Sequence, residues 1–110
     1  MLFRSSLRQT SASVSCTPTT IPVNGTTTCT ATVTDTAGAG ATTPTGTVSF
    51  TTDSGTFGGS GNCTLDATGR CSVTYTPTVV GAHTITSSYK GDSVHAVSSG
   101  SATVKSVLGL

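Results

Sequence analysis

Polar and apolar residues alternate with a period of two in many short stretches of this chain, and that period limits what it can fold into. The clearest case is TTTCTATVTD, residues 26–35, which places Cys29, Ala31 and Val33 on one face and threonines on the other. Successive side chains of a β-strand point to opposite faces, so this spacing is typical of a half-buried strand. Threonine, with 26 copies among 110 residues, is β-branched and favours a pleated surface. We therefore expect strands and no amphipathic helix.

The same alternation recurs in runs of similar length along the chain. The expected strands are residues 11–17, 26–35, 46–51, 62–66, 70–76, 83–89 and 101–107. The segments between them contain Gly, Pro, Asn and Asp, which end strands and form turns, as at Asn24 and in the loop 36–46. Seven short strands at these spacings predict an all-β fold, a seven-stranded antiparallel β-sandwich.

The expected hydrophobic core of this sandwich is small. The chain has the length of one domain, contains no Trp, and is only 5% aromatic. A domain of this size buries only part of the surface that its unfolded chain exposes. We therefore expect an additional source of stability.

Four cysteines, Cys16, Cys29, Cys63 and Cys71, are our candidates for that additional source. Each lies on the inward face of its expected strand. Cys16 and Cys29 flank one turn, and Cys63 and Cys71 flank another. Four cysteines allow three pairings; the sequence favours Cys16 with Cys29 and Cys63 with Cys71 and leaves the other two open. Closing loops this short contributes about 2.5 to 3 kcal/mol each in the chain-entropy model. We expect Cys63 and Cys71 to face each other across a hairpin.

The charge and the cysteine content limit which binding partners and which cellular compartment we expect. Charged residues make up 8% of the chain, the formal net charge is +1, and the five basic residues are scattered. Nucleic acid and anionic membranes attract clustered Lys and Arg, so we expect neither as a partner. No stretch approaches the roughly 20 apolar residues of a membrane span. Disulfides persist in oxidising compartments, so we expect an extracellular or cell-surface protein. The start, MLFRSSLRQT, lacks the apolar run of a secretion signal, which suggests a processed chain or a piece of a longer one.

Four segments together resemble a known family. They are SVSCTPTTIPVNGTTTCTATVTD, PTGTVSF, GTFGGSGNCTLDATGRCSVTYTP and GAHTITSSYKGDSVHAVSSGSATV. They resemble the bacterial Ig-like domain repeats that occur in tandem on large secreted and surface-anchored proteins. The resemblance covers residues 11–105 and implies a seven-stranded Ig-like sandwich that acts as a spacer, stalk or adhesive module, with no catalytic role. It leaves residues 1–10 as a tail or linker and residues 106–110 as a second tail. We expect neighbouring Ig-like modules or identical subunits as partners.

The chain departs from the antibody version of this fold in two ways. Cys29 has no partner cysteine in the expected strand 83–89, and there is no Trp to pack against such a bridge. We therefore expect both disulfides to join adjoining strands. Cohesion between the two sheets is then expected to come from ordinary side-chain packing.

Catalytic and metal-binding interpretations have less support. His83 shares the phase of Ile85 and is expected at a strand edge, whereas His95 is expected on the surface of a loop. No nucleophile pattern accompanies either histidine, so we expect no enzyme and no catalytic residue. The cysteine gaps exceed the spacing of about two to four residues that zinc sites favour. Asp35 and Asp92 could meet at one end of the sandwich, but calcium needs more oxygen ligands, and we expect no metal and no cofactor.

Two asparagines and two loops leave other roles open. Asn24 and Asn62 lie in the acceptor triplets NGT and NCT, which matter only where the host glycosylates Asn. Loops 36–46 and 53–62 could bind surface carbohydrate or a protein, although Phe57 is their single aromatic residue. Recognition of such a ligand is the alternative function that we weigh against a structural one.

The two tails carry apolar residues with no obvious place in the sandwich. These residues are Leu2, Phe3, Leu7, Leu108 and Leu110. We interpret the tails as linker ends. An alternative is that one tail adds a strand to a neighbour's exposed sheet edge, where backbone groups are unpaired, and so makes the chain a filament subunit.

Overall fold

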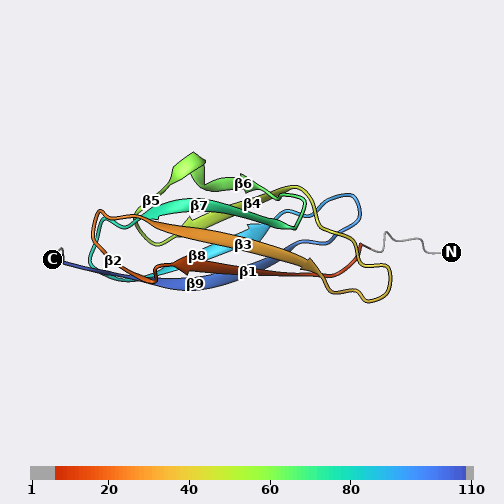
Figure 1. Ribbon diagram of the computed structural model, residues 1–110, viewed down its shortest axis with the longest axis horizontal. Coiled ribbons are helices and arrows are strands. Elements are labelled where there is room, and N and C mark those ends of the chain that lie inside the picture. Colours follow the sequence, from red (N-terminus) through yellow and green to blue (C-terminus); the bar gives the residue numbers. More distant parts are fainter. Residues whose placement is uncertain (1–6, 109–110) are drawn as a thin grey trace.

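The computed structural model describes residues 7–108, which form two β-sheets packed into a sandwich (Figure 1). One sheet contains β1 (Thr10–Thr17), β3 (Thr27–Asp35), β7 (Arg70–Thr76) and β5 (Thr56–Phe57), in that spatial order. The other contains β2 (Thr20–Pro22), β9 (Ser98–Val107), β8 (Gly81–Tyr89), β4 (Thr47–Thr52) and β6 (Asn62–Thr64), in that order. A 3₁₀ turn, η1 (Gly58–Gly61), connects β5 to β6. Within residues 7–108 no helix is long and apolar enough to cross a membrane.

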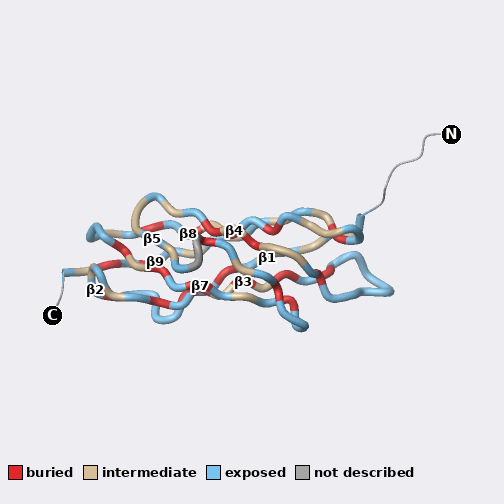
Figure 2. Tube along the Cα trace, turned by 90° about the horizontal axis from the view of Figure 1, so that it is seen from above, coloured by how far each residue is buried: buried red, intermediate tan, exposed pale blue. Residues whose placement is uncertain are grey.

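The predicted all-β sandwich is confirmed, and two short strands add to the seven that were expected. β2 has three residues and β5 has two, too few for a period of two to be visible in the sequence. The predicted inward faces are also confirmed, because Cys29, Ala31 and Val33 are at most 2% exposed. Buried residues accordingly alternate with exposed ones along the strands, as Figure 2 shows.

The core is one layer of inward side chains between the sheets. Its members are Val14, Cys16, Ile21, Cys29, Ala31, Val33, Val48, Phe50, Leu65, Val73, Tyr75, Ile85, Tyr89 and Val104. The two tyrosines each donate a hydrogen bond to a backbone carbonyl, Tyr75 to Ser54 at 2.6 Å and Tyr89 to Thr45 at 2.7 Å. Their hydroxyls are therefore satisfied although the rings are buried.

The two disulfides play different structural roles. Cys16–Cys29 joins β1 to β3, where the two cysteines are direct register partners in one sheet. Cys63–Cys71 joins β6, which pairs with β4, to β7, which pairs with β3, and therefore links the two sheets. The predicted hairpin at this second pair is wrong, and so is the expectation of no covalent link between the sheets. The physical reason is that the turn at 65–69 carries the chain from one sheet to the other.

One side of the sandwich is closed by a close approach of β1 to β9. A Cβ atom at Gly100 in β9 would lie 2.5 Å from the carbonyl oxygen of Ala12 and 3.0 Å from the Cα of Ser13, both in β1. Real Cβ atoms do not come this near to backbone, so a larger residue would force the strands apart. Glycine at position 100 therefore lets the sheets meet along this side.

The long axis of the sandwich has two ends, which we name by the chain segments that form them. The N pole comprises residues 7–9, 36–46, 66–69 and 90–97, and the C pole comprises residues 18–26, 53–55, 77–80 and 108. The strand registers fix this assignment, because β1 and β9 both run from the N pole toward the C pole. The described chain thus enters at one end and leaves at the other, as Figure 1 shows.

Ordered structure extends past both limits of the expected domain 11–105. β1 begins at Thr10, and Arg8 forms an isolated parallel bridge with His95. β9 continues to Val107, and Ser106 is 1% exposed. The expected tails are therefore partly built into the sandwich. The tail residues Leu2, Phe3 and Leu110 lie outside the described residues.

Candidate functional site

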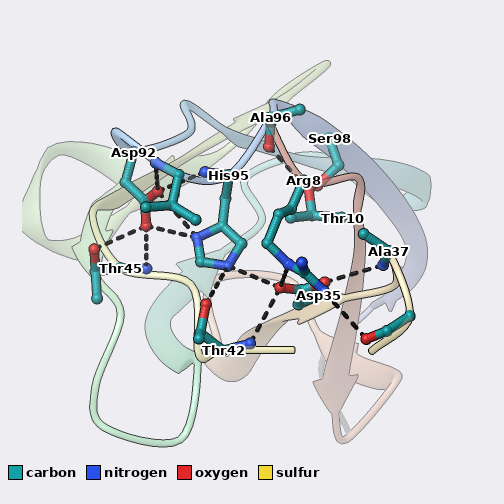
Figure 3. A network of polar contacts seen from close by, with 12 residues as sticks. Arg8, Thr10, Asp35, Ala37, Thr42, Thr45, Asp92, His95, Ala96 and Ser98 are labelled. Carbon is teal, nitrogen blue, oxygen red and sulfur yellow. Dashed lines mark hydrogen bonds and ion pairs between the residues drawn. The ribbon is translucent and has the colours of Figure 1, made fainter. Parts of the chain in front are cut away.

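The N pole contains a cluster of charged side chains drawn from three separate parts of the chain (Figure 3). Asp35 is the last residue of β3, Asp92 and His95 lie in the loop after β8, and Arg8 precedes β1. The side chains of Asp35 and His95 are only 2% and 3% exposed, and those of Asp92 and Arg8 are 17% and 23% exposed. Buried charges need partners, so the geometry of the cluster decides what it does.

His95 lies between two carboxylates. Its Nδ1 is 2.9 Å from both oxygens of Asp92, and its Nε2 is 3.2 Å from Oδ2 of Asp35 and 3.0 Å from Oγ1 of Thr42. A neutral imidazole has one N–H group, so donation to both carboxylates requires the imidazolium form. Burial lowers the pKa of His95, but the hydrogen bonds and charges of Asp92 and Asp35 outweigh burial and raise that pKa. The site therefore favours a charged histidine.

Besides His95, three donors hold Asp35 as a carboxylate. Arg8 donates a hydrogen bond to its Oδ2, and the backbone N–H groups of Ala37 and Thr42 donate at 3.0 and 3.1 Å. The Arg8 hydrogen bond, supported by the two backbone donors, lowers the pKa of Asp35 far below its usual range although burial opposes the shift. Arg8 thereby fixes the chain before β1 to the end of β3.

Asp92 joins the loop after β8 to the loop before β4. Its Oδ1 accepts hydrogen bonds from the backbone N–H groups of Val94 and His95, both at 2.7 Å. Its Oδ2 accepts from the backbone N–H and the hydroxyl of Thr45, at 3.0 and 2.9 Å. Burial raises the pKa of Asp92, but these donors outweigh it and lower the pKa far below its usual range. With Arg8 and imidazolium, the cluster has two positive and two negative charges and is neutral as a whole.

A second buried histidine occupies the corresponding place near the C pole. His83 in β8 is 3% exposed, and its Nε2 lies 2.6 Å from the carbonyl oxygen of Val79. Its Nδ1 lies 3.1 Å from Oγ of Ser54 and 3.2 Å from Oδ1 of Asp53. His83 thus ties the segment before β8 to the segment after β4. Each pole therefore has one buried histidine whose two ring nitrogens both contact hydrogen-bonding partners in neighbouring segments.

Both sequence expectations about the histidines are wrong. His95 is buried because the loop after β8 folds back over the N pole, where the carboxylate of Asp92 holds its backbone. His83 is the third residue of β8, which lies between β9 and β4, and so is not at the edge of a sheet. The spacing of Asp92 three residues before His95 is the one local signal that could have indicated a structured loop.

The expected meeting of Asp35 with Asp92 takes place through His95. Each carboxylate contacts the imidazole ring from its own side. Among residues 7–108 no three His, Cys, Asp or Glu side chains are arranged to hold a metal ion. Arg8 was missed because it lies in the expected tail.

The other candidate site residues lie apart from the cluster. Asn24 is exposed, has a φ of 69°, and turns the chain from β2 to β3. Asn62 is exposed at the start of β6, and its Oδ1 accepts a hydrogen bond of 2.8 Å from Ser49. Phe57 is half-buried, with its ring centroid 5.9 Å from that of Phe50 and 5.2 Å from that of Tyr75. It therefore extends the core and offers little free aromatic surface.

Known proteins share this architecture. A family model described as "Bacterial Ig-like domain (group 3)" matches residues 14–107. No curated protein sequence matches the chain. A solved structure of the D0-D1 domain of intimin is similar, with a TM-score of 0.62 and 24% identity over 84% of this chain and 45% of that one. The D00-D0 domain of intimin has a TM-score of 0.62 and 17% identity over 87% of this chain and 45% of that one. The chain thus spans about half the length of these structures.

Proposed function

We propose a structural function for this chain, which belongs to the bacterial Ig-like domain family (group 3). It is a non-catalytic module of an extracellular or cell-surface protein and acts as a spacer, an adhesin stalk segment or a filament subunit. The observation that carries this proposal is the course of the chain, which enters at the N pole and leaves at the C pole. Because the chain enters and leaves at opposite ends, each repeated copy of such a module would lengthen an array by the length of its long axis.

Three further observations support the proposal. Two disulfides suit an oxidising environment outside the cell. The ring nitrogens of His83 and His95 are engaged in internal hydrogen bonds and are not free for proton transfer to a substrate. The similar solved chains are each named for a pair of intimin domains, and this chain corresponds to 45% of their length. These features fit one module of a series.

The spacer function is testable on a cell surface. One, two or three copies of the chain are placed between a membrane anchor and a fluorescently labelled epitope, and the height of the epitope above the membrane is measured. We expect the height to increase with each copy. An epitope height that does not change with copy number would contradict the spacer function.

The alternative, a recognition domain, rests on the loop before β4. An open surface pocket of about 260 Å³ lies beside this loop and is lined by Thr34, Thr42, Thr43, Pro44 and Thr68 among others. The hydroxyl groups could bind a sugar, but the lining includes no aromatic residue on which a sugar could stack. A glycan array with the isolated chain distinguishes the two functions. Saturable binding that Thr42→Ala and Thr43→Ala abolish would favour recognition over a purely structural role.

A further inference from the structure

Large exposed apolar side chains are confined to the two ends of the sandwich. Among residues 7–108 they are Leu7, Val79, Val80, Val94, Val97 and Leu108. Three lie at the N pole and three at the C pole, whereas the outward faces of the strands carry mostly Thr and Ser. Scattered exposed apolar residues need no explanation, but segregation of all six to opposite poles does.

The N-pole patch consists of Leu7, Val94 and Val97, which are 39%, 46% and 70% exposed. Backbone hydrogen bonds join the two segments that carry these residues, because the N–H of Arg8 donates to the carbonyl of Val94 at 2.7 Å and the N–H of Ala96 donates to the carbonyl of Arg8 at 2.8 Å. The charged cluster beneath fixes the same two segments. The patch is therefore presented on a rigid support although it lies in loops.

The C-pole patch consists of Val79, Val80 and Leu108, which are 55%, 47% and 72% exposed. The carbonyl oxygen of Val79 accepts hydrogen bonds from His83 at 2.6 Å and from the hydroxyl of Ser106 at 2.7 Å. Both donors are almost fully buried, so this loop is also fixed from beneath. At each pole, a small exposed apolar surface is held in place by a buried histidine and its hydrogen-bonding partners.

We propose that the two patches are docking surfaces through which consecutive copies of this module stack end to end in one polypeptide. The C-pole patch of one copy packs against the N-pole patch of the next. The inference rests on the proposed function as a serial module and adds to it that the joint between modules is a packed contact and not a free hinge. Because the two surfaces differ, the contact is head to tail and can repeat without limit.

The size of the patches favours a covalently linked copy as the occupant over a separate chain. A docked pair of patches covers on the order of 500 Å² of side-chain surface, well below the about 1,200 Å² of stable interfaces between separate proteins. A short linker raises the effective concentration of the neighbouring patch to about the millimolar range and makes so small a contact sufficient. Separate chains at micromolar concentration should therefore stay monomeric, whereas linked copies should dock.

The test is a tandem of two full-length copies, studied by ¹⁵N relaxation, which gives a rotational correlation time for each module. The pair V79S and V80S is introduced either into the first copy, whose C pole faces the junction, or into the second copy, whose C pole is free. The second variant is a matched control, because it carries the same substitutions in the same local fold. A melting curve of each variant confirms that both copies remain folded.

We expect the unmodified tandem to tumble as one elongated body, with correlation times at least twice that of the single chain. Substitution in the first copy should reduce these times toward the single-chain value, and substitution in the second should leave them unchanged. Independent tumbling in the unmodified tandem, or equal effects of the two variants, would overturn the proposal. The spacer function would survive that result if the epitope height still grew with copy number.

Discussion

Replacing Cys63 and Cys71 with alanine removes the disulfide that joins the two sheets and should destabilise the module strongly. The two cysteines are 8 residues apart in sequence, and closing a loop of that length contributes about 2.5 kcal/mol in the chain-entropy model. For a domain of this size a loss of that magnitude lowers the melting temperature by roughly 10 to 20 °C. The loss is a large share of the roughly 5 to 15 kcal/mol that stabilises a typical domain.

The double variant Cys16→Ala with Cys29→Ala provides the comparison. Its loop is 13 residues long and contributes about 3 kcal/mol in the same model, but its disulfide lies within one sheet. Urea unfolding measures the free energy of both variants, and amide hydrogen exchange locates the effect. Exchange in β6 should accelerate only when Cys63–Cys71 is removed, because β6 otherwise pairs with β4 at only three positions. An unchanged urea midpoint, or unaltered exchange in β6, would refute this reasoning.

Two further predictions concern the N pole and the closed side of the sandwich. The stability difference between the wild type and His95→Gln, measured by thermal unfolding, should be largest between about pH 4 and 6.5. The pKa of His95 is higher in the folded protein than in the unfolded chain. His95 therefore stabilises the fold fully at a pH below its unfolded pKa, and this stabilisation is lost as the pH rises through its folded pKa. The pKa values of Asp35 and Asp92 are lowered in the folded protein, so the stability that these carboxylates contribute is lost as the pH falls below about 4. A stability difference between wild type and His95→Gln that stays constant from pH 5 to 9 would contradict the charged histidine. Gly100→Ala should lower the free energy of unfolding by about 1 to 3 kcal/mol, because the added Cβ would meet the backbone of β1. The control Ser101→Ala, at an exposed position, should change it by no more than about 0.5 kcal/mol. Equal urea midpoints for these two variants would count against the close approach of β1 to β9.

The strands could be predicted because their signal is local. Val33 and its neighbours alternate with threonine within a single run, and burial follows that alternation directly. The short strands β2 and β5 carry no such signal, since they exist only through pairing with β9 and β7. Local pattern therefore predicts where a strand lies but not which partners very short strands find.

The features that the sequence missed depend on contacts between distant residues. The segment DATGR has the appearance of a hairpin turn, and only the pairing of β6 with β4 shows that Cys63 belongs to the other sheet. His95 is buried by partners that include Asp35, 60 residues away in sequence, and Arg8, 27 residues from Asp35, was hidden in an expected tail. The cysteine phases were correctly predicted as inward, because burial on one face is again a local property.

Small-angle X-ray scattering on one, two and three fused copies tests most directly the central claim that this module is a unit of length. The maximum dimension should increase by the same increment with each added copy, and that increment should match the long axis of the module. A maximum dimension that stays near that of a single copy, as when modules fold back side by side, would contradict the account.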